Sequence, residues 1–303
     1  MTYFMYLFCL IVWGLNFIAV KIQGTPVALE VSLTYRLAMT AVLFILFALF
    51  IKRTNKPSAT DMPFIVVFGV CNFALSYLCL YYATILSSAA IVTLIFSLKV
   101  ILTPIALRLF LKETLHARVW IGGCFGIIGV GVLIVPSLSS IDGLTDLKGV
   151  LIALVGTLLT SVGDASSARN AKQRINPVHA NAIGFTVASL LMGAIVWFQG
   201  TPLTLPTTVT YLSALLYLTV IASFLAWLFY LKLVERIGGA KSGYMVALFP
   251  LIGGVASVLI GESTLSLPLI IGCLFSCIGA SVALGIRPFR QRNEIKYSAN
   301  VNS

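Results

Sequence analysis

The chain has 303 residues, of which 59% are hydrophobic and only 10% are charged, and its mean hydropathy is +1.05. This composition excludes an ordinary soluble domain, in which about 45–50% of residues are apolar and about 25% are charged. The formal net charge is +11, but the basic residues form short scattered clusters without interleaved aromatic residues, so we expect no nucleic acid partner.

The apolar residues gather into ten blocks, each close to the roughly 20 residues that cross about 30 Å of hydrocarbon. The blocks cover residues 3–20, 31–51, 63–82, 86–110, 119–135, 149–168, 178–198, 211–231, 240–260 and 268–286. They predict an all-α integral membrane protein with ten transmembrane helices, in contact with the lipid bilayer. The first block contains Trp13 and Asn16 and has no basic segment before it, so we expect a retained span and not a cleaved signal peptide.

The basic residues alternate between the loops. If the amino terminus is cytoplasmic, the loops on that side and the tail at 287–303 hold sixteen Lys and Arg residues, whereas the outer loops hold only Lys21 and Lys148. The remaining two, Arg36 and Lys99, lie inside predicted spans. By the positive-inside rule, this distribution predicts a multi-pass protein of the cytoplasmic (inner) membrane with both termini in the cytoplasm.

Two parts of the chain resemble each other at offsets of 149 to 150 residues. Glu113 closes the fourth span and Glu262 closes the ninth. The small residues that follow them are Gly122, Gly126 and Gly129 in the first copy and Gly272, Ser276 and Gly279 in the second. Because five spans separate the copies, the second half enters the membrane in the opposite sense, as in many secondary transporters. We expect inverted five-helix repeats at 1–136 and 149–286, joined by an external linker at 137–148.

The spacing of these small residues indicates close helix packing. Gly122 with Gly126, and Gly272 with Ser276, follow the small-xxx-small pattern that supports helix association in lipid. We expect packing within one chain, and the alternative is the seam of a homodimer.

Lys99 lies near the middle of the apolar stretch 86–107. A charge at the bilayer centre costs roughly 2.5 to 3.5 kcal/mol, and such residues usually face a wet cavity. The lysine stem reaches only about 6 Å, so Lys99 needs a local partner, and Asp164 is the single acidic residue inside a predicted span. We expect both to line a substrate pathway, where a substrate carboxylate or a proton exchanges with the pair. The alternative is a purely structural pair.

Three other charged residues lie near predicted span ends. Arg36 is shallow enough to snorkel to the outer face, so we expect a structural role, with substrate steering as the alternative. Glu113 and Glu262 sit beside tight turns, where a carboxylate accepts hydrogen bonds from the amino terminus of the next helix. We expect them to cap that helix, and gating is the alternative.

Prolines and polar–aromatic pairs indicate further pathway positions. Pro104 and Pro250 free carbonyl groups one turn earlier, so each predicts a helix break or a passive kink. The pairs that share a helix face are Trp13 with Asn16, Asn72 with Ser76, and Trp227 with Tyr230. These residues line the pathway or simply pack, since aromatic residues at helical spacing more often pack.

The motifs of enzymes and ATP-driven pumps are missing from the sequence. It contains no HExxH, GxSxG or Walker motif, and its histidines, His116 and His179, lie in or beside loops. The six cysteines all fall in predicted spans, which favours packing over a disulfide framework or a metal site. We therefore expect neither catalysis nor a cofactor.

Several motifs carry a family resemblance. Trp13-Gly14-Leu15-Asn16-Phe17 with Lys21, Tyr35-Arg36-Leu37-Ala38, and the two glutamates occur in the order typical of the drug/metabolite transporter superfamily, and the chain resembles its EamA-type members. The resemblance implies ten helices in two inverted halves, cytoplasmic termini, and export or uptake of small metabolites such as amino acids. The chain departs from this pattern at Lys99, which stands where the second copy has Phe249, and at Asp164.

These observations favour a secondary transporter that moves a small polar metabolite by alternating access, with an amino acid or its derivative as the favoured substrate, driven by protons or by exchange. A nucleoside-like or cationic substrate is one alternative. A non-transporting membrane subunit or a lipid flippase helper is the other.

Overall fold

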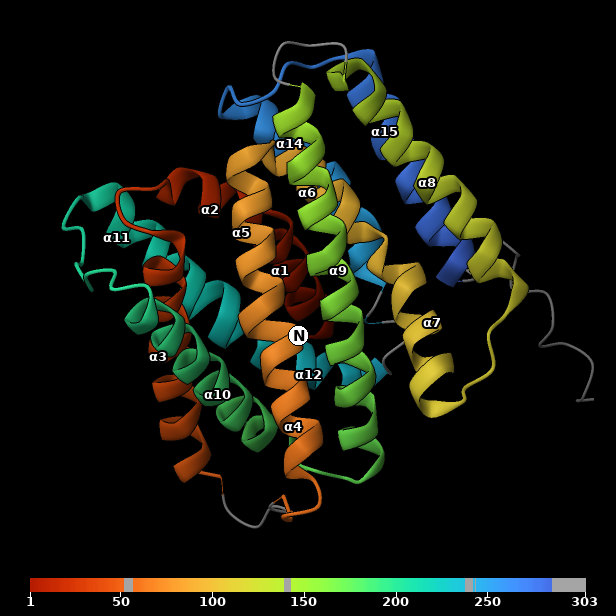
Figure 1. Ribbon diagram of the computed structural model, residues 1–303. Helices are drawn as coiled ribbons and strands as arrows, with labels where there is room; N and C mark the ends of the chain where they lie inside the picture. Colours follow the sequence, from red (N-terminus) through yellow and green to blue (C-terminus); the bar gives the residue numbers. More distant parts are fainter. Residues whose placement is uncertain (52–56, 139–142, 238–241, 243, 285–303) are drawn as a thin grey trace, which may run out of the picture.

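The computed structural model describes residues 1–51, 57–138, 143–237, 242 and 244–284. Within these residues all regular secondary structure is helical, and it forms ten apolar segments (Figure 1). Seven segments are long and apolar enough to cross a membrane, and three shorter ones cover Ala117–Val132, Phe249–Leu259 and Leu267–Ala283. The predicted all-α class and the ten segments are confirmed.

Four of the ten segments are interrupted, and the others are single helices. In chain order they are α1–α2 (Thr2–Gly14, Asn16–Gln23), α3 (Leu29–Leu49), α4–η1–α5 (Met62–Gly69, Val70–Leu75, Ser76–Leu86), α6–α7 (Ala89–Ser97, Lys99–Leu111), α8 (Ala117–Leu138), α9 (Gly143–Lys172), α10 (Pro177–Phe198), α11–η2–α12 (Val209–Leu216, Tyr217–Leu225, Ala226–Ile237), η3–α14 (Tyr244–Leu248, Phe249–Leu259) and α15 (Leu267–Leu284). The interrupted segments are the first, third, fourth and eighth, and a short 3₁₀ turn, η3, precedes α14. Both η1 and η2 are π-helical.

The contacts between helices follow the pattern expected for two halves with the same architecture. Helix α8 lies along α15, α3 lies along α10, and α6 packs against α14 (Figure 1). These contacts join the fifth segment to the tenth, the second to the seventh, and the fourth to the ninth. The first segment meets the eighth through α1 and α12, and the sixth meets the third through α9 and α5. The pattern is that of two five-helix halves facing each other across a two-fold axis, although the exact limits of the halves stay a prediction.

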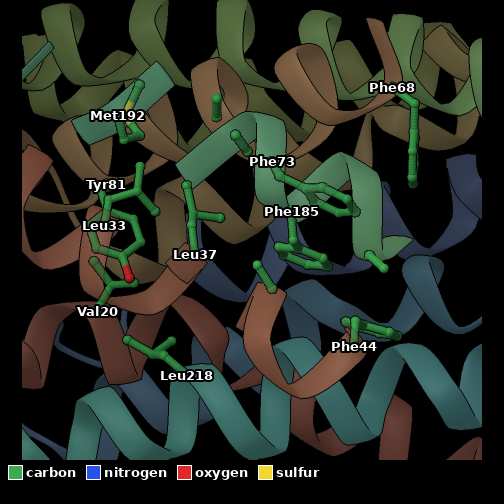
Figure 2. Close-up of a cluster of buried hydrophobic side chains, with 14 of the residues drawn as sticks. Val20, Leu33, Leu37, Phe44, Phe68, Phe73, Tyr81, Phe185, Met192 and Leu218 are labelled. Carbon is green, nitrogen blue, oxygen red and sulfur yellow. The ribbon is translucent and has the colours of Figure 1, made fainter. Parts of the chain in front are cut away.

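An aromatic stack fixes the π-helical turn of the third segment in the core. The rings of Phe73 in η1 and Phe185 in α10 are stacked with centroids 3.8 Å apart, and Phe44 of α3 lies 5.5 Å from Phe185 (Figure 2). All three side chains are fully buried. Large rings that pack in this way contribute about 0.5–1.5 kcal/mol per pair beyond the area they bury. The stack therefore holds η1 against the second and seventh segments.

An ion pair joins the start of α4 to the end of α9. Asp61 lies 2.5 Å from Arg169, whose guanidinium also covers the ring of Phe64 at 4.1 Å. Hydrogen bonds from Ser58, together with the one from Arg169, lower the pKa of Asp61 to about 2. The carboxylate therefore stays charged at any physiological pH, and the pair ties the third segment to the sixth.

Small residues let α8 and α15 approach closely. A Cβ atom added at Gly122 would lie 2.6 Å from the Cβ atom of Ala283, and one added at Gly129 would lie 2.8 Å from the carbonyl oxygen of Gly272. The absent side chains allow the two helices to pack almost backbone to backbone.

The other two residues of the predicted small-residue pattern face the fourth segment. A Cβ atom at Gly126 would lie 2.8 Å from the side chain of Leu98, and the hydroxyl groups of Ser276 and Ser97 share a hydrogen bond of 2.5 Å. The contacts at all four residues lie within one chain, as intramolecular packing requires. The homodimer seam stays a prediction.

We expect Gly122→Ala to destabilise the protein by about 1–3 kcal/mol, because the added methyl group overpacks the contact with α15. Gly131→Ala is the matched control on the same helix, since nothing lies within 4 Å of its added Cβ atom. The control should be neutral or slightly stabilising. Thermal unfolding in detergent measures both, and equal melting temperatures for the two variants would contradict the close approach.

Candidate functional site

A lysine–aspartate ion pair joins α7 to α9 inside the protein. The Nζ atom of Lys99 lies 3.0 Å from Oδ2 of Asp164, and the two side chains are 19% and 20% exposed. Thr103 donates a hydrogen bond of 2.9 Å to the same oxygen, and Asn72 donates one of 3.1 Å to Oδ1. Both carboxylate oxygens are therefore held, by groups from the third and fourth segments. The ion pair expected from the sequence is present.

Asp164 reaches Asn72 because α9 comes very close to η1. The residue before Asp164 is Gly163, and a Cβ atom there would lie only 2.7 Å from the Cβ atom of Asn72. The π-helical turn that presents Asn72 is itself of a kind often found at functional sites. Ser76 donates its hydroxyl proton to the carbonyl oxygen of Asn72 at 2.6 Å, so this predicted pathway residue bonds its own segment.

Lys99 is the first residue of α7, and Leu98 separates it from α6. Ser97 lies directly before the interruption. Its hydroxyl donates to the carbonyl oxygen of Leu94 at 2.6 Å, and in a continuous α-helix that oxygen would accept the N–H of Leu98. The N–H of Leu98 bonds Ile95 instead, at 3.0 Å, which tightens the turn and re-aims the following lysine.

The two prolines differ in their position relative to the helix interruptions. Pro104 lies inside α7. The carbonyl group that it frees, one turn earlier, belongs to Val100, two residues after the interruption at Leu98, and the role of this proline as a helix break stays a prediction. Pro250 is the second residue of α14 and directly follows the junction with η3. A proline is tolerated in the first turn of a helix because that N–H has no intrahelical partner.

Arg36 of α3 is almost completely enclosed, with 1% exposure. Its Nε, Nη1 and Nη2 atoms donate to Ser223, Tyr81 and Asn16 at 3.0, 3.2 and 3.1 Å. The guanidinium also lies over the ring of Tyr77, 4.6 Å from its centroid. The expectation that Arg36 snorkels to the outer face is wrong, because residues of three other segments enclose its head group.

The guanidinium of Arg36 has no opposite charge beside it. Among the residues that the structure describes, no carboxylate lies within 4.0 Å of it. Glu30, six residues earlier on α3, instead accepts a hydrogen bond of 2.5 Å from Tyr82. An ion without a counter-charge in a protein interior costs several kcal/mol even after the surroundings relax. The hydrogen bonds and the tyrosine face offset part of this cost.

Three aromatic residues of the predicted pathway pack together near the start of α12. The ring of Trp13 lies 5.6 Å from Trp227 and 5.2 Å from Tyr230, and its Nε1 donates to the carbonyl oxygen of Ala222 at 2.9 Å. Phe249, the equivalent of Lys99 in the second half, lies 6.5 Å from Trp13. The sequence therefore identified three aromatic residues that pack together, whereas Asn16 belongs to the cluster around Arg36.

Glu262 lies in a network at one end of the molecule. Its carboxylate is 3.2 Å from Lys21 and accepts hydrogen bonds from Ser257 at 2.7 Å and from the backbone N–H of Ala89 at 3.0 Å. It therefore caps α6, in the other half, and not the next helix as expected. A cavity of about 460 Å³ adjoins this pair, and its lining includes hydroxyl groups such as that of Ser88 and the charged residue Asp146.

Glu113 forms an ion pair of 2.6 Å with Lys172 at the end of α9. This pair is the counterpart of the pair between Glu262 and Lys21, but it is much more exposed: its lysine and glutamate side chains are 54% and 39% exposed, against 30% and 9%. The expected role of Glu113 as a cap of the next helix stays a prediction.

Several residues of these clusters were not proposed from the sequence as site or gating residues. They are Thr103, Tyr77, Tyr81 and Ser223, and the gating candidates Lys21 and Lys172. The two lysines did carry a signal. They end the first and sixth segments 151 residues apart, close to the offset between the glutamates. The described residues contain no group of three or more His, Cys, Asp or Glu side chains placed to hold a metal ion.

Comparisons with known proteins agree with this architecture. Residues 1–135 and 147–285 each match the EamA-like transporter family. An uncharacterized transporter of Clostridium kluyveri is 21% identical over 82% of this chain and 79% of its own length, and one of Archaeoglobus fulgidus is 22% identical over 85% and 87%. A crystal structure of another protein, 18% identical, matches with a TM-score of 0.66 over 93% of this chain and 96% of its own, which supports the fold alone.

We expect Asp164→Asn to destabilise the protein by about 3 kcal/mol, because it leaves the Lys99 ammonium without its counter-charge. The double variant Lys99→Gln with Asp164→Asn should recover most of the loss, since a neutral pair needs no counter-charge. Thermal unfolding of the wild type, both single variants and the double variant measures the coupling. Strictly additive effects would show that the two side chains do not interact.

Proposed function

Because this chain belongs to the EamA-like transporter family, we propose that it is a secondary transporter that moves a small polar metabolite across the cytoplasmic membrane by alternating access. An amino acid or a derivative is the favoured cargo, and it is exported or taken up. Proton coupling or exchange supplies the energy. Both termini lie in the cytoplasm, in accordance with the distribution of basic residues.

The observation that carries this proposal is the ion pair between Lys99 and Asp164. It lies in the interior of an apolar chain, at an interruption of the fourth segment, and a fifth of each side chain is exposed. Transporters commonly place their cargo at such interrupted helices between two halves. In the empty protein the two charges satisfy each other. A charged cargo competes for them, with Lys99 available to a carboxylate and Asp164 to an ammonium group.

Two equivalent ion pairs supply the gates of the alternating-access cycle. The pair of Lys21 and Glu262 joins the two halves at the predicted outer end, and that of Lys172 and Glu113 joins them at the predicted inner end. The outer pair is the more buried and has additional hydrogen bonds, which favours closure at that end. When one of these gate pairs breaks while the other stays formed, the ion pair of Lys99 and Asp164 becomes accessible from one side of the membrane. The opposite change makes it accessible from the other side.

Transport activity tests the central role of Lys99. We expect purified protein in liposomes to exchange a labelled amino acid, chosen by a thermal-shift screen of the twenty standard L-amino acids and other small metabolites. Lys99→Gln should lower the exchange rate at least tenfold, because it removes one of the two charges that the cargo meets. Lys148→Gln is the matched control, since Lys148 is exposed at the start of α9.

The result separates the classes of function. Unaltered exchange in folded Lys99→Gln protein would overturn the proposed site. The absence of exchange for every metabolite that stabilises the wild type would favour a non-transporting subunit. Movement of a labelled lipid with no metabolite flux would favour a flippase helper.

Cross-linking tests the gates. We expect a short reducible thiol reagent that joins Lys21→Cys to Glu262→Cys to stop exchange, and reduction to restore it, because the two halves can no longer separate at that end. Each single cysteine variant treated with the same reagent is the control. Full exchange by the cross-linked protein would show that this end does not move during transport.

A further inference from the structure

We propose that Arg36 is an anion subsite that binds the carboxylate of the cargo, and that the cargo is consequently a zwitterionic amino acid whose ammonium group is received by Asp164. This inference rests on the proposed transport function and adds the class and the orientation of the cargo. It is argued from the hydrogen-bonding capacity of Arg36, its lack of a counter-charge and its position relative to Asp164.

The guanidinium of Arg36 carries more N–H donors than its hydrogen-bond partners use. Arginine carries five N–H groups, and the partners of Arg36 take one each from Nε, Nη1 and Nη2. One N–H therefore remains on each terminal nitrogen. A carboxylate has two oxygens at the spacing of two guanidinium donors, so it is the group best suited to take both.

The charge of Arg36 is not matched by its surroundings. Its three hydrogen-bond partners, Asn16, Tyr81 and Ser223, are neutral, and the face of the guanidinium is covered by a tyrosine ring. In contrast, Lys99 lies 3.0 Å from a carboxylate. Among the described residues, Arg36 is thus an enclosed cation that the protein itself leaves without an opposite charge, and an incoming carboxylate supplies that charge.

The surroundings of Arg36 are built at irregular points of the helices. Asn16 is the first residue of α2, directly after the interruption at Leu15, and Ser223 lies within the π-helical η2. At such points the backbone can change its hydrogen bonding at low cost, which suits a site that must admit and release a ligand. The two groups also come from opposite halves, so a movement between the halves would alter access to Arg36.

The third segment relates Arg36 to Asp164. Tyr77 covers the guanidinium and Asn72 holds the carboxylate, and they lie five residues apart on η1 and α5. Both groups therefore adjoin the same segment. In the proposed arrangement, a zwitterion places its carboxylate at Arg36 while its ammonium group competes with Lys99 for Asp164.

Ligands with altered ends test this orientation in wild-type protein. The probes are the stabilising L-amino acid, its amide, which lacks the carboxylate, and its N-acetyl form, which lacks the ammonium group. We expect both derivatives to bind about tenfold to a hundredfold more weakly than the amino acid, as measured by concentration-dependent thermal shift. An amide that binds as tightly as the acid would overturn the subsite without any need for a variant.

Variants of Arg36 then locate the discrimination. Arg36→Gln should bind the amino acid no better than its amide, and Arg36→Lys should recover part of the preference for the acid. Lys148→Gln, at an exposed position outside both charge clusters, is the comparison variant and should still prefer the acid over the amide. If the Arg36 variants retain the wild-type preference, the carboxylate binds elsewhere.

The failure of this inference is distinguishable from the failure of the transport function. If metabolites other than amino acids are exchanged and Lys99→Gln abolishes that exchange, the transporter assignment holds and the zwitterion subsite is wrong. If Arg36→Gln does not fold, the wild-type comparison of acid, amide and N-acetyl probes still decides the question.

Discussion

Charges enclosed among apolar helices must be met by groups of the protein itself, and this constraint organises the interior of the molecule. In a regular helix the backbone N–H and C=O groups bond one another, and the side chains project at fixed spacing. In this protein the enclosed charges bond to residues that lie at irregular points of the helices. Lys99 follows an interruption at Leu98, while Asn72 and Ser223 are presented by π-helical turns to Asp164 and Arg36. The irregular points and the buried charges are therefore parts of one arrangement.

The two halves are equivalent in architecture but not in charge. The helices pair according to a two-fold relationship, yet the equivalent of Lys99 in the second half is Phe249, which packs near Trp13. The first half supplies both interior cations, and the second half supplies Asp164. In the proposed transport cycle, the paired architecture would allow the halves to move, whereas the unequal charges of the interior would give a bound molecule one preferred orientation.

Patterns along the chain were sufficient for the architecture and for one feature of the site. Apolar blocks of the right length gave the ten segments, and the cost of an isolated charge led from Lys99 to Asp164. The position of the interruption, at Leu98, was not predicted, because the hydrogen bonds around it do not follow from the apolar pattern. The depth of Arg36 and the partner of Glu262 were also missed, since both depend on contacts between distant segments that local spacing does not encode.

The unequal burial of the two lysine–glutamate pairs has a consequence for how the protein responds to its surroundings. Mobile ions screen exposed charges over a Debye length of about 8 Å at physiological ionic strength, but they act only weakly on charges enclosed by protein. The pair of Lys172 and Glu113 is open to such screening, and that of Lys21 and Glu262 is largely shielded. If the two pairs gate the proposed transport cycle, the salt concentration on the side of Lys172 and Glu113 would shift the balance between its two conformations more than that on the other side.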